Sequence, residues 1–308
     1  MKHPPRLIAM PLVGTGVLAA FAGPAAAAPA APSASPSAYW TAARMQSATP
    51  LDLLDVGKST VGDVNKVVRG LSKKIGPTSP LADSTGARWT GGGKVKHTAG
   101  RVFFKFKGQD ASCSGDAVTS KNKSVVVTAG HCVKYEGSWH KNWVFVPGYH
   151  DGKRPFGTWP AKKLLTTPQW KKSENLNYDV GMAVVGSRGG KKLTQAVGGQ
   201  GIAFNQPRGK AMYAFGYPAE SPYDGEKLIY CNGTAFDEPL GQSNDQGLNC
   251  TQTGGASGGP WFLKFSRSKG TGLQNSVNSF KYSFSPAWMF GPYFGKQAAA
   301  LYQRAQTS

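Results

Sequence analysis

The chain has 308 residues, of which 40% are hydrophobic, so it is long enough for one large domain or two small domains with a buried core. It carries 36 Lys and Arg against 16 Asp and Glu, a net charge of +20, but the basic residues occur singly or in pairs. We therefore interpret the charge as a solvated basic surface, with attraction to polyanions as the alternative. We expect no nucleic-acid partner, because no recognition motif accompanies the charge.

The first residues predict export. Lys2 and Arg6 precede the apolar run LIAMPLVGTGVLAAFAG and the small-residue stretch PAAAAPA, which is the pattern of a secretory signal peptide. We place this signal at residues 1–28. Pro11 and three glycines interrupt the run, and no later stretch is apolar enough to cross a bilayer, so we expect a secreted, extracellular protein with no stable membrane anchor.

Residues 29–90 differ in composition from the rest of the chain. Residues 29–38 are low-complexity, rich in Ala, Pro and Ser, which predicts disorder. Between 61 and 75 the apolar residues follow helical spacing, which predicts one amphipathic helix that Gly76 and Pro77 end. We interpret 29–90 as a pro-region and linker, with an extension that stays attached as the alternative. The stretch ARWTGGGKVKHTAG (87–100) is expected to be an exposed junction.

After residue 100 the pattern changes to short strands. The run RVFFKFKG alternates, with Val102, Phe104 and Phe106 on one face, and further short apolar runs follow between Gly, Pro, Asn and Asp turns. Helical spacing returns only in GKQAAALYQRA near the C-terminus. The pattern predicts an all-β domain, as a sandwich or as barrels.

Ser257 lies in the glycine-rich stretch TGGASGGPW, and its hydroxyl would need a base to become a nucleophile. The stretch also fits the G-x-S-x-G motif of α/β-hydrolases, which requires a histidine after the serine. All histidines of the chain precede Ser257, so that arrangement is excluded. Among them His131 stands out, because it directly follows the apolar run in SVVVTAGHCV.

The stretches TAGHC and GGASGGP together resemble the chymotrypsin-like serine peptidases. The stretches GYPAE and TGGASGGPWF are most similar to the bacterial secreted branch that includes the glutamyl endopeptidases. The resemblance covers roughly residues 95–305 and implies a trypsin-like peptidase domain at 91–308. Its fold would be two antiparallel six-stranded Greek-key β-barrels, about 95–195 and about 196–305, with the active site between them and a short C-terminal helix.

The resemblance implies that His131 is the general base and Ser257 the nucleophile. Asp179, in NLNYDVGMAVVG, lies between them in sequence and opens an alternating apolar strand, so we predict that it orients His131. The backbone N–H groups of Gly255 and Ser257 would form the oxyanion hole. The weaker candidates for the acid, which precede no comparable strand, are Asp110, Asp116 and Asp151.

Ala256 departs from the animal digestive branch of the family. There an aspartate precedes the serine and pairs with a newly freed N-terminus to form the oxyanion hole. Ala256 cannot make that ion pair, so we expect activation by removal of the pro-region instead.

Four cysteines in an exported chain predict disulfides, and their number alone permits three connectivities. The absence of a C-x-x-C spacing argues against a zinc site, so no metal is expected. The resemblance implies that Cys113 pairs with Cys132, and that Cys231 then pairs with Cys250.

The resemblance also places the floor of the substrate pocket five or six residues before the serine. No acidic residue lies there, which disfavours Arg or Lys at the cleaved position. Polar and basic residues could accept an acidic side chain, although the histidine that glutamyl endopeptidases use has no counterpart after Ser257. The predicted floor and wall residues are Thr251, Gln252, Asn278, Ser279, Phe280 and Lys281.

These observations predict an exported serine endopeptidase, made as a zymogen, that acts on polypeptide substrates through an acyl-enzyme. It would be a monomer and would use no metal or cofactor. The alternatives are a non-catalytic binding protein on a serine-peptidase fold and an esterase on the same scaffold.

Overall fold

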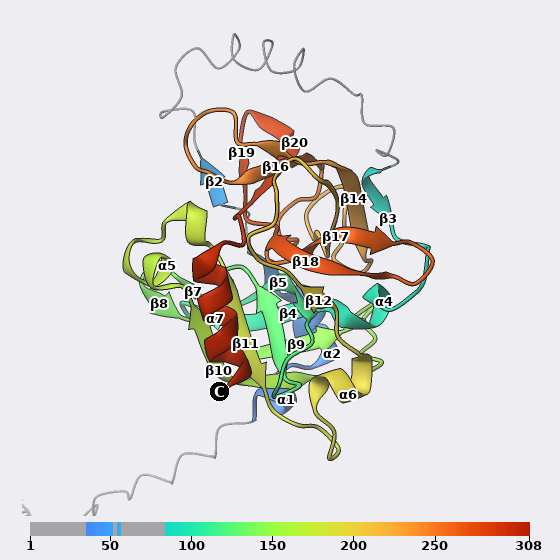
Figure 1. Cartoon of the computed structure of the whole chain (residues 1–308). Coiled ribbons are helices and arrows are strands. Elements are labelled where there is room, and N and C mark those ends of the chain that lie inside the picture. The colour runs from blue at the N-terminus through green and yellow to red at the C-terminus, as the bar shows by residue number, and fades with distance from the viewer. Residues whose placement is uncertain (1–34, 52–53, 57–83) are drawn as a thin grey trace, which may run out of the picture. The chain divides into compact units, whose positions relative to one another are not determined.

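The computed structural model describes residues 35–51, 54–56 and 84–308, and β-strands dominate it (Figure 1). The signal peptide predicted at 1–28 and the amphipathic helix predicted between 61 and 75 lie outside the described residues. Among the helices of the described part, none is long and apolar enough to cross a membrane.

Six antiparallel strands close into a first barrel. They pair in the order β5-β4-β9-β10-β11-β6, and β6 pairs with β5 to complete the ring. One continuous core fills it, and Val126, Phe145 and Met182 are fully buried there. The six strands are β4 (Ala99–Phe106), β5 (Gln109–Ala117), β6 (Val125–Thr128), β9 (Lys141–Pro147), β10 (Trp159–Thr166) and β11 (Gly181–Val185).

β4 is buried on both of its faces. Val102 and Phe104 belong to the core of the barrel, as their alternation predicts. Phe103 lies on the opposite face and packs against Trp40, with 5.5 Å between the ring centroids. The outer face of the strand is therefore covered by a segment that precedes the barrel in sequence.

Two sheets form the second half. One has the order β12-β18-β17-β13-β14-β3 and the other β15-β16-β20-β19-β2, so each ends on a strand from before residue 91. The strands of the first sheet are β12 (Gly201–Ile202), β18 (Thr271–Val277), β17 (Pro260–Ser266), β13 (Ala211–Gly216), β14 (Ile229–Thr234) and β3 (Thr85–Arg88). Those of the second are β15 (Phe236–Asp237), β16 (Gln246–Asn249), β20 (Ser285–Gly291), β19 (Phe280–Tyr282) and β2 (Leu54–Val56).

The C-terminal helix α7 (Lys296–Gln306) follows the second half but packs against the first barrel (Figure 1). Ala298, Leu301 and Ala305 on one face of this helix belong to the barrel core. The predicted C-terminal helix is therefore confirmed. The remaining elements are α1 (Pro36–Tyr39), α2 (Ala42–Ser47), β1 (Thr49–Pro50), α4 (Val95–Thr98), β7 (Lys134–Tyr135), β8 (Ser138–Trp139), α5 (Pro168–Ser173), the 3-10 turn η2 (Leu176–Tyr178) and α6 (Leu193–Val197).

Two expectations for the N-terminal part are wrong. Residues 36–38, predicted as disordered, begin helix α1, and Trp40 directly after it is fully buried. The junction at 87–100 is exposed only in part, because Trp89 and Val95 are buried in the same core cluster as Trp40. A window rich in Ala, Pro or Gly hides single large apolar residues, and these residues dock on the body of the protein.

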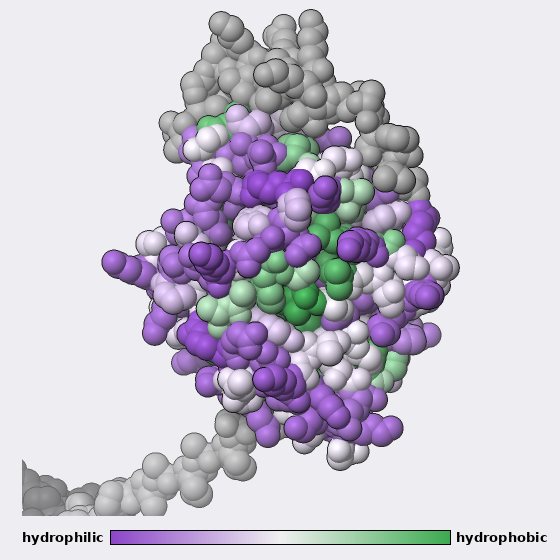
Figure 2. Space-filling model, in the orientation of Figure 1, coloured by the Kyte–Doolittle hydropathy of each residue, from purple (hydrophilic) through white to green (hydrophobic). Residues whose placement is uncertain are grey.

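On the face seen in Figure 2, hydrophilic side chains are spread widely rather than gathered in one block. Figure 2 shows one face, on which hydrophilic residues surround a hydrophobic area over β12 and β18. Among the described residues, the one large hydrophobic side chain with substantial exposure is Trp139, at 39%.

Candidate active site

Strand pairing brings His131 and Asp179 together. β6 and β11 are antiparallel with Thr128 opposite Gly181, so the residues after Thr128 run beside those before Gly181. Asp179 Oδ1 accepts the backbone N–H of His131 at 2.8 Å, and Asp179 Oδ2 lies 2.7 Å from His131 Nδ1. Both side chains are fully buried. Because a carboxylate only accepts, the neutral ring carries its proton on Nδ1 and presents a lone pair at Nε2.

Gly130 makes this approach possible. A Cβ at Gly130 would lie 2.8 Å from Asp179 Oδ1 and 2.8 Å from the ring of Trp170. No other residue fits there without moving the carboxylate or the indole. The glycine in TAGHC is therefore explained by the contact between the loop and Asp179.

Ser279 binds the same carboxylate from the second half of the chain. Its Oγ donates to Asp179 Oδ2 at 2.6 Å, and its side chain is fully buried. Asp179 thus accepts from three groups, two of His131 and one of Ser279. We predicted Ser279 only as a residue of the pocket wall, and its sequence position gave no sign of this second role.

His140 supports His131 from the other side. Its Nε2 donates to the backbone carbonyl of His131 at 2.8 Å, and its ring stacks on Phe104 with 4.1 Å between centroids. Burial lowers the pKa of His140 to about 4, so this ring is neutral at pH 7. Sequence analysis missed this residue, because an isolated histidine in a polar loop has no distinguishing pattern.

The turn that carries Ser257 packs against the end of β6. Ser114 N–H donates to the carbonyl of Ser257 at 2.8 Å, and Ser114 Oγ donates to the carbonyl of Gly255 at 2.9 Å. A Cβ at Gly258 would overlap Thr128 Oγ1 and lie 2.8 Å from the N of Ala129. Ser257 therefore lies close to the loop that ends in His131. Among the described residues, Ser257 Oγ and His131 Nε2 are buried without a hydrogen-bond partner.

Gly255 adopts a conformation that other residues rarely reach, with φ +86°. A Cβ there would lie 2.9 Å from the carbonyl oxygen of Tyr217, so a side chain is excluded by space as well. The backbone N–H of Gly255 donates to a peptide carbonyl, that of Leu51, at 3.1 Å. This N–H is therefore oriented to receive a carbonyl oxygen, as an oxyanion-hole donor must be.

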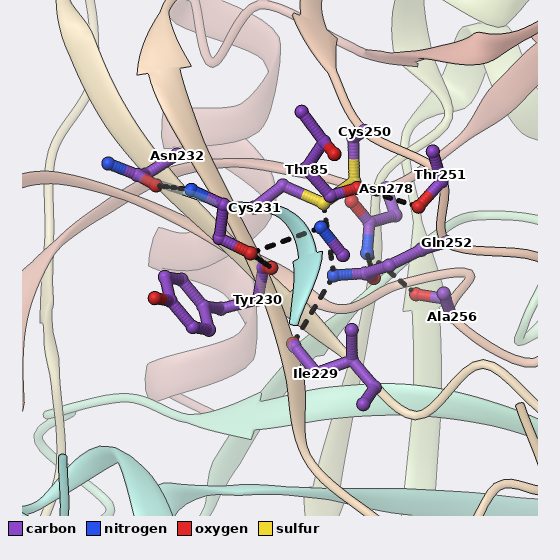
Figure 3. Close-up of a disulfide and its surroundings, with 12 residues drawn as sticks. Thr85, Ile229, Tyr230, Cys231, Asn232, Cys250, Thr251, Gln252, Ala256 and Asn278 are labelled. Carbon is purple, nitrogen blue, oxygen red and sulfur yellow. Dashed lines mark hydrogen bonds between the residues drawn. A yellow bond between two sulfur atoms is a disulfide. The ribbon is translucent and has the colours of Figure 1, made fainter. Parts of the chain in front are cut away.

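Asn278 binds Ala256, the residue before Ser257, through its side-chain amide (Figure 3). Its Nδ2 lies 3.0 Å from Phe215 O, 3.1 Å from Gln252 Oε1 and 2.9 Å from Ala256 O. Its Oδ1 accepts from Trp261 Nε1 at 2.7 Å, and the side chain is fully buried. Asn278, which we predicted in the pocket wall, therefore links the segments that contain Phe215, Gln252, Ala256 and Trp261.

The predicted pocket floor differs at its two positions. Gln252 is buried, and its Nε2 donates to the carbonyl of Ile229 at 3.2 Å. Thr251 is exposed, and its Oγ1 donates to the carbonyl of Thr85 at 2.7 Å, a contact drawn in Figure 3. The floor residue nearer to solvent is thus bound to a segment from before residue 91.

The end of the predicted wall carries the one cation of the six pocket residues. Phe280 is buried and stacks on Phe290, so it contributes a ring to the wall. Lys281 Nζ donates to the carbonyl of Cys250 at 2.8 Å and to that of Pro286. Burial lowers the pKa of Lys281 to about 8, so the side chain is largely protonated at neutral pH.

Both predicted disulfides are present. Cys113 bonds to Cys132, directly beside His131, and Cys231 bonds to Cys250, beside the pocket floor (Figure 3). Each joins cysteines 19 positions apart in sequence. One cross-link therefore restrains the loop of the proposed base, and the other restrains the approach to Ser257.

One group of potential metal ligands exists in the described part of the chain, formed by Cys113, His131 and Cys132. Its two sulfur atoms are joined to each other, and a disulfide offers no thiolate to a metal ion. The donor set therefore does not fit a metal site.

Comparison with solved structures finds proteases. The chain is 44% identical to the protease Anisep from Arthrobacter nicotinovorans, with a TM-score of 0.65 over 70% of this chain and 97% of that one. It is 43% identical to AL20, a thermostable serine protease from an extremophilic microorganism, with a TM-score of 0.66 over 70% of this chain and 99% of that one. A Glu endopeptidase matches with a TM-score of 0.58 over 73% of this chain and 98% of that one, but at 16% identity this likeness shows the fold alone.

The sequence comparisons match less of the chain than the structure comparisons do. No family model matches the chain. An extracellular metalloprotease of Bacillus subtilis (strain 168) is 34% identical over 70 residues, which is 22% of this chain and 21% of that protein. The match thus spans about a fifth of the length of this curated relative, whereas the solved structures match over nearly their whole length and confirm the predicted two-barrel fold.

Proposed function

The chain belongs to the chymotrypsin-like serine proteases, and from this premise we propose that it is a secreted endopeptidase whose nucleophile is Ser257. His131 acts as its base and Asp179 orients that base. The observation that carries the proposal is the 2.7 Å contact between His131 Nδ1 and Asp179 Oδ2, because it leaves Nε2 able to accept a proton.

The reaction follows from these positions. Ser257 Oγ attacks the carbonyl carbon of a peptide bond while its proton passes to His131 Nε2. The resulting imidazolium is stabilised by Asp179 and returns the proton to the leaving amine, which leaves an acyl-enzyme on Ser257. A water molecule, activated by the same histidine, then releases the acyl group. The proposed chemistry needs no metal or cofactor, since the side chains supply both nucleophile and base.

The oxyanion of the tetrahedral intermediate requires backbone donors. We assign this role to the N–H groups of Gly255 and Ser257. Support comes from the N–H of Gly255, which binds a peptide carbonyl oxygen at 3.1 Å in this structure. The positive φ of Gly255 disfavours any residue with a side chain at this position.

Two features support export as a precursor. The N-terminal run at 1–28 has the pattern of a signal peptide, and disulfides such as Cys113–Cys132 persist mainly outside the reducing cytosol. In this proposal 29–90 is the pro-region and 91–308 the mature enzyme, which acts as a monomer on extracellular polypeptides.

The cleaved position is proposed to be non-basic. No acidic side chain lies at the predicted floor, Thr251 and Gln252, so an arginine or lysine of the substrate would find no counter-charge. Lys281 on the predicted wall favours an acidic side chain instead. A peptide library cleaved by the processed protein tests this, and predominant cleavage after Arg or Lys would contradict it.

A non-catalytic binding protein on the same fold is the rival proposal, and an esterase is a third. A binding protein has no use for the complete set formed by His131, Asp179, Ser257 and the N–H of Gly255, which favours catalysis. An esterase would share the acyl-enzyme chemistry and would differ only in cleaving esters but not peptides.

Labelling with a small fluorophosphonate separates these proposals. We expect a covalent adduct on the processed protein at neutral pH that is lost in Ser257→Ala, while Ser187→Ala, which removes an exposed hydroxyl, keeps Ser257 as its labelling site. Cleavage of a protein substrate by the labelling-competent form then distinguishes a peptidase from an esterase. The absence of any adduct dependent on Ser257 would favour the binding protein.

A further inference from the structure

Residues 49–51 and 54–56 contact the proposed active site. The carbonyl of Leu51 accepts the N–H of Gly255 at 3.1 Å, and the N–H of Leu54 lies 3.4 Å from the carbonyl of Ser279. Gly255 is the proposed oxyanion donor, and Ser279 binds the carboxylate of Asp179. Leu51 and Leu54 therefore each contact a residue of the proposed active site.

The same segment occupies the strand edge that an extended substrate would use. β2 pairs in parallel with β19, placing Leu54 opposite Phe280, and without β2 the strand β19 would be an open edge of its sheet. An open edge presents free N–H and C=O groups, which extended peptides bind by adding a strand. On the other side β1 pairs in parallel with β5, and Leu51 N–H donates to Ser112 O at 2.9 Å.

The residues before this segment are anchored to the first barrel. Trp40 and Met45 are fully buried, and Trp40 Nε1 donates to the carbonyl of Asn142 at 2.7 Å. Around them, Asp110 accepts from Tyr39 at 2.6 Å and pairs with Arg44 at 3.1 Å. These contacts hold residues 35–48 independently of the residues that contact the site.

The reactive groups are closed off in this form of the chain. Ser257 and His131 have no exposed surface, although a peptidase must bring both into contact with a polypeptide. In the described part of the chain, the backbone N–H of Gly255 donates to the carbonyl of Leu51. The proposed oxyanion donor is therefore occupied by a peptide group of the protein itself.

We propose that residues 35–56 form an inhibitory strap, a separable segment that binds the substrate cleft of this chain by strand addition and excludes polypeptides from Ser257. The proposal rests on the proposed function of that site. It also divides activation into two steps, cleavage of the chain and dissociation of the strap. A single cut after residue 56 leaves the strap bound through Trp40 and Met45, so activity requires its dissociation, and the free segment inhibits when it is added back.

A cut placed in the full-length protein tests this. A recognition sequence for a site-specific protease is inserted between residues 57 and 83, and labelling of Ser257 by a small fluorophosphonate is timed before the cut, after the cut, and after dilution of the cut protein. We expect the uncut protein to react at least about 100-fold more slowly than the cut and diluted protein. A synthetic peptide of residues 35–56 should restore the slow rate as its concentration rises.

Modified peptides show whether the strand contact carries the effect. N-methylation of Leu51 removes the N–H that donates to Ser112 O, and we expect it to weaken inhibition at least about tenfold. The matched control is N-methylation of Ala42, the first residue of α2, which follows the extended Thr41 and therefore tolerates a missing N–H. Equal effects of the two modifications would overturn strand addition as the mode of binding.

The remaining outcomes separate the strap from the proposed function. If the uncut protein labels as fast as the cut protein, the strap is not inhibitory. If neither labels, the assignment of Ser257 fails, and the strap is then judged by binding of a fluorescent 35–56 peptide to the cut Ser257→Ala protein. Saturable binding that N-methylation of Leu51 weakens would support the strap, and lack of binding would overturn it.

Discussion

The two halves of the protein hold their proposed reactive groups by different means. In the first barrel, the proposed base and acid are held by side-chain hydrogen bonds and one backbone N–H. Asp179 accepts two hydrogen bonds from His131 and one from Ser279. In the second half, Ser257 stands on a backbone turn whose shape depends on Gly255 at φ +86° and on the buried amide of Asn278.

This difference predicts how a substitution in each half should affect activity and stability. The first depends on the chemistry of a few atoms, so a change of one functional group should abolish activity while the fold persists. The second also depends on the path of the backbone, so a change in the residues that shape the turn around Ser257 should lower stability and activity together. Ser279 joins the two, because it lies on the second half and binds the acid of the first.

The largest expected effect is that of Asp179→Asn. The amide places a donor where His131 Nδ1–H now donates, which favours the tautomer with its proton on Nε2 and removes the base. We expect kcat to fall about 10⁴-fold with little change in KM, measured with the preferred peptide of the processed protein.

Two controls accompany that measurement. Circular dichroism should show the fold of Asp179→Asn unchanged, and the double variant with Ser257→Ala should be no less active than Ser257→Ala alone, because the residues act as one unit. Additive losses would contradict the assignment of Asp179 to the triad.

Removal of each disulfide sharpens the comparison. The two cross-links span equal separations of 19 positions, so the chain-entropy model gives each a similar contribution, about 3 kcal/mol. We expect Cys113→Ala/Cys132→Ala and Cys231→Ala/Cys250→Ala to lower the free energy of unfolding by similar amounts, measured with a denaturant. The first pair should lower kcat more, since Cys132 adjoins His131, whereas the second should mainly raise KM through the pocket floor. Equal kinetic profiles would contradict this division.

Asn278→Leu tests the backbone-dependent half. The change leaves the buried N–H of Trp261 without its acceptor and frees Ala256 O and Phe215 O, so we expect a loss of about 2 kcal/mol in the free energy of unfolding. Fluorophosphonate labelling of the folded variant should also slow. Asn244→Ala, at an exposed loop position, serves as control and should change neither quantity. A variant that loses stability but labels at the normal rate would show that Asn278 does not control the shape of the turn that carries Ser257.

The sequence was informative where one side chain and its immediate neighbours determine the chemistry. His131, Asp179 and Ser257 were predicted from short motifs and their order, and the structure brings His131 and Asp179 into contact. Strand β4 followed from the alternation in RVFFKFKG, whereas the arrangement as two six-stranded barrels came from the family resemblance. The disulfide pairing came from the family resemblance, because cysteine spacing alone allows three connectivities.

The sequence was less informative where a role depends on packing between distant segments. The bond from Ser279 to Asp179 joins residues 100 positions apart, and nothing local marks it. The docking of Trp40 was hidden in a low-complexity window, since composition averages out a single buried indole. The contacts of the strap with the site could not be foreseen either, because those of Leu51 and Leu54 are backbone bonds that any sequence can make.

The smallest expected effect concerns charge at the predicted pocket wall. Burial lowers the pKa of Lys281 to about 8, so the side chain is cationic below that pH and loses its charge above it. We expect peptides with Glu at the cleaved position to be favoured over those with Gln by about fivefold at pH 6.5, a typical value for a partly screened charge pair, and the preference to disappear by about pH 9.5. The measurement is the ratio of kcat/KM for a Glu and Gln pair, which cancels any pH dependence that the two substrates share. In Lys281→Met the ratio should be low and independent of pH. A ratio that rises above pH 8, or that survives in Lys281→Met, would remove Lys281 from the specificity of the site and leave the pocket to its neutral residues.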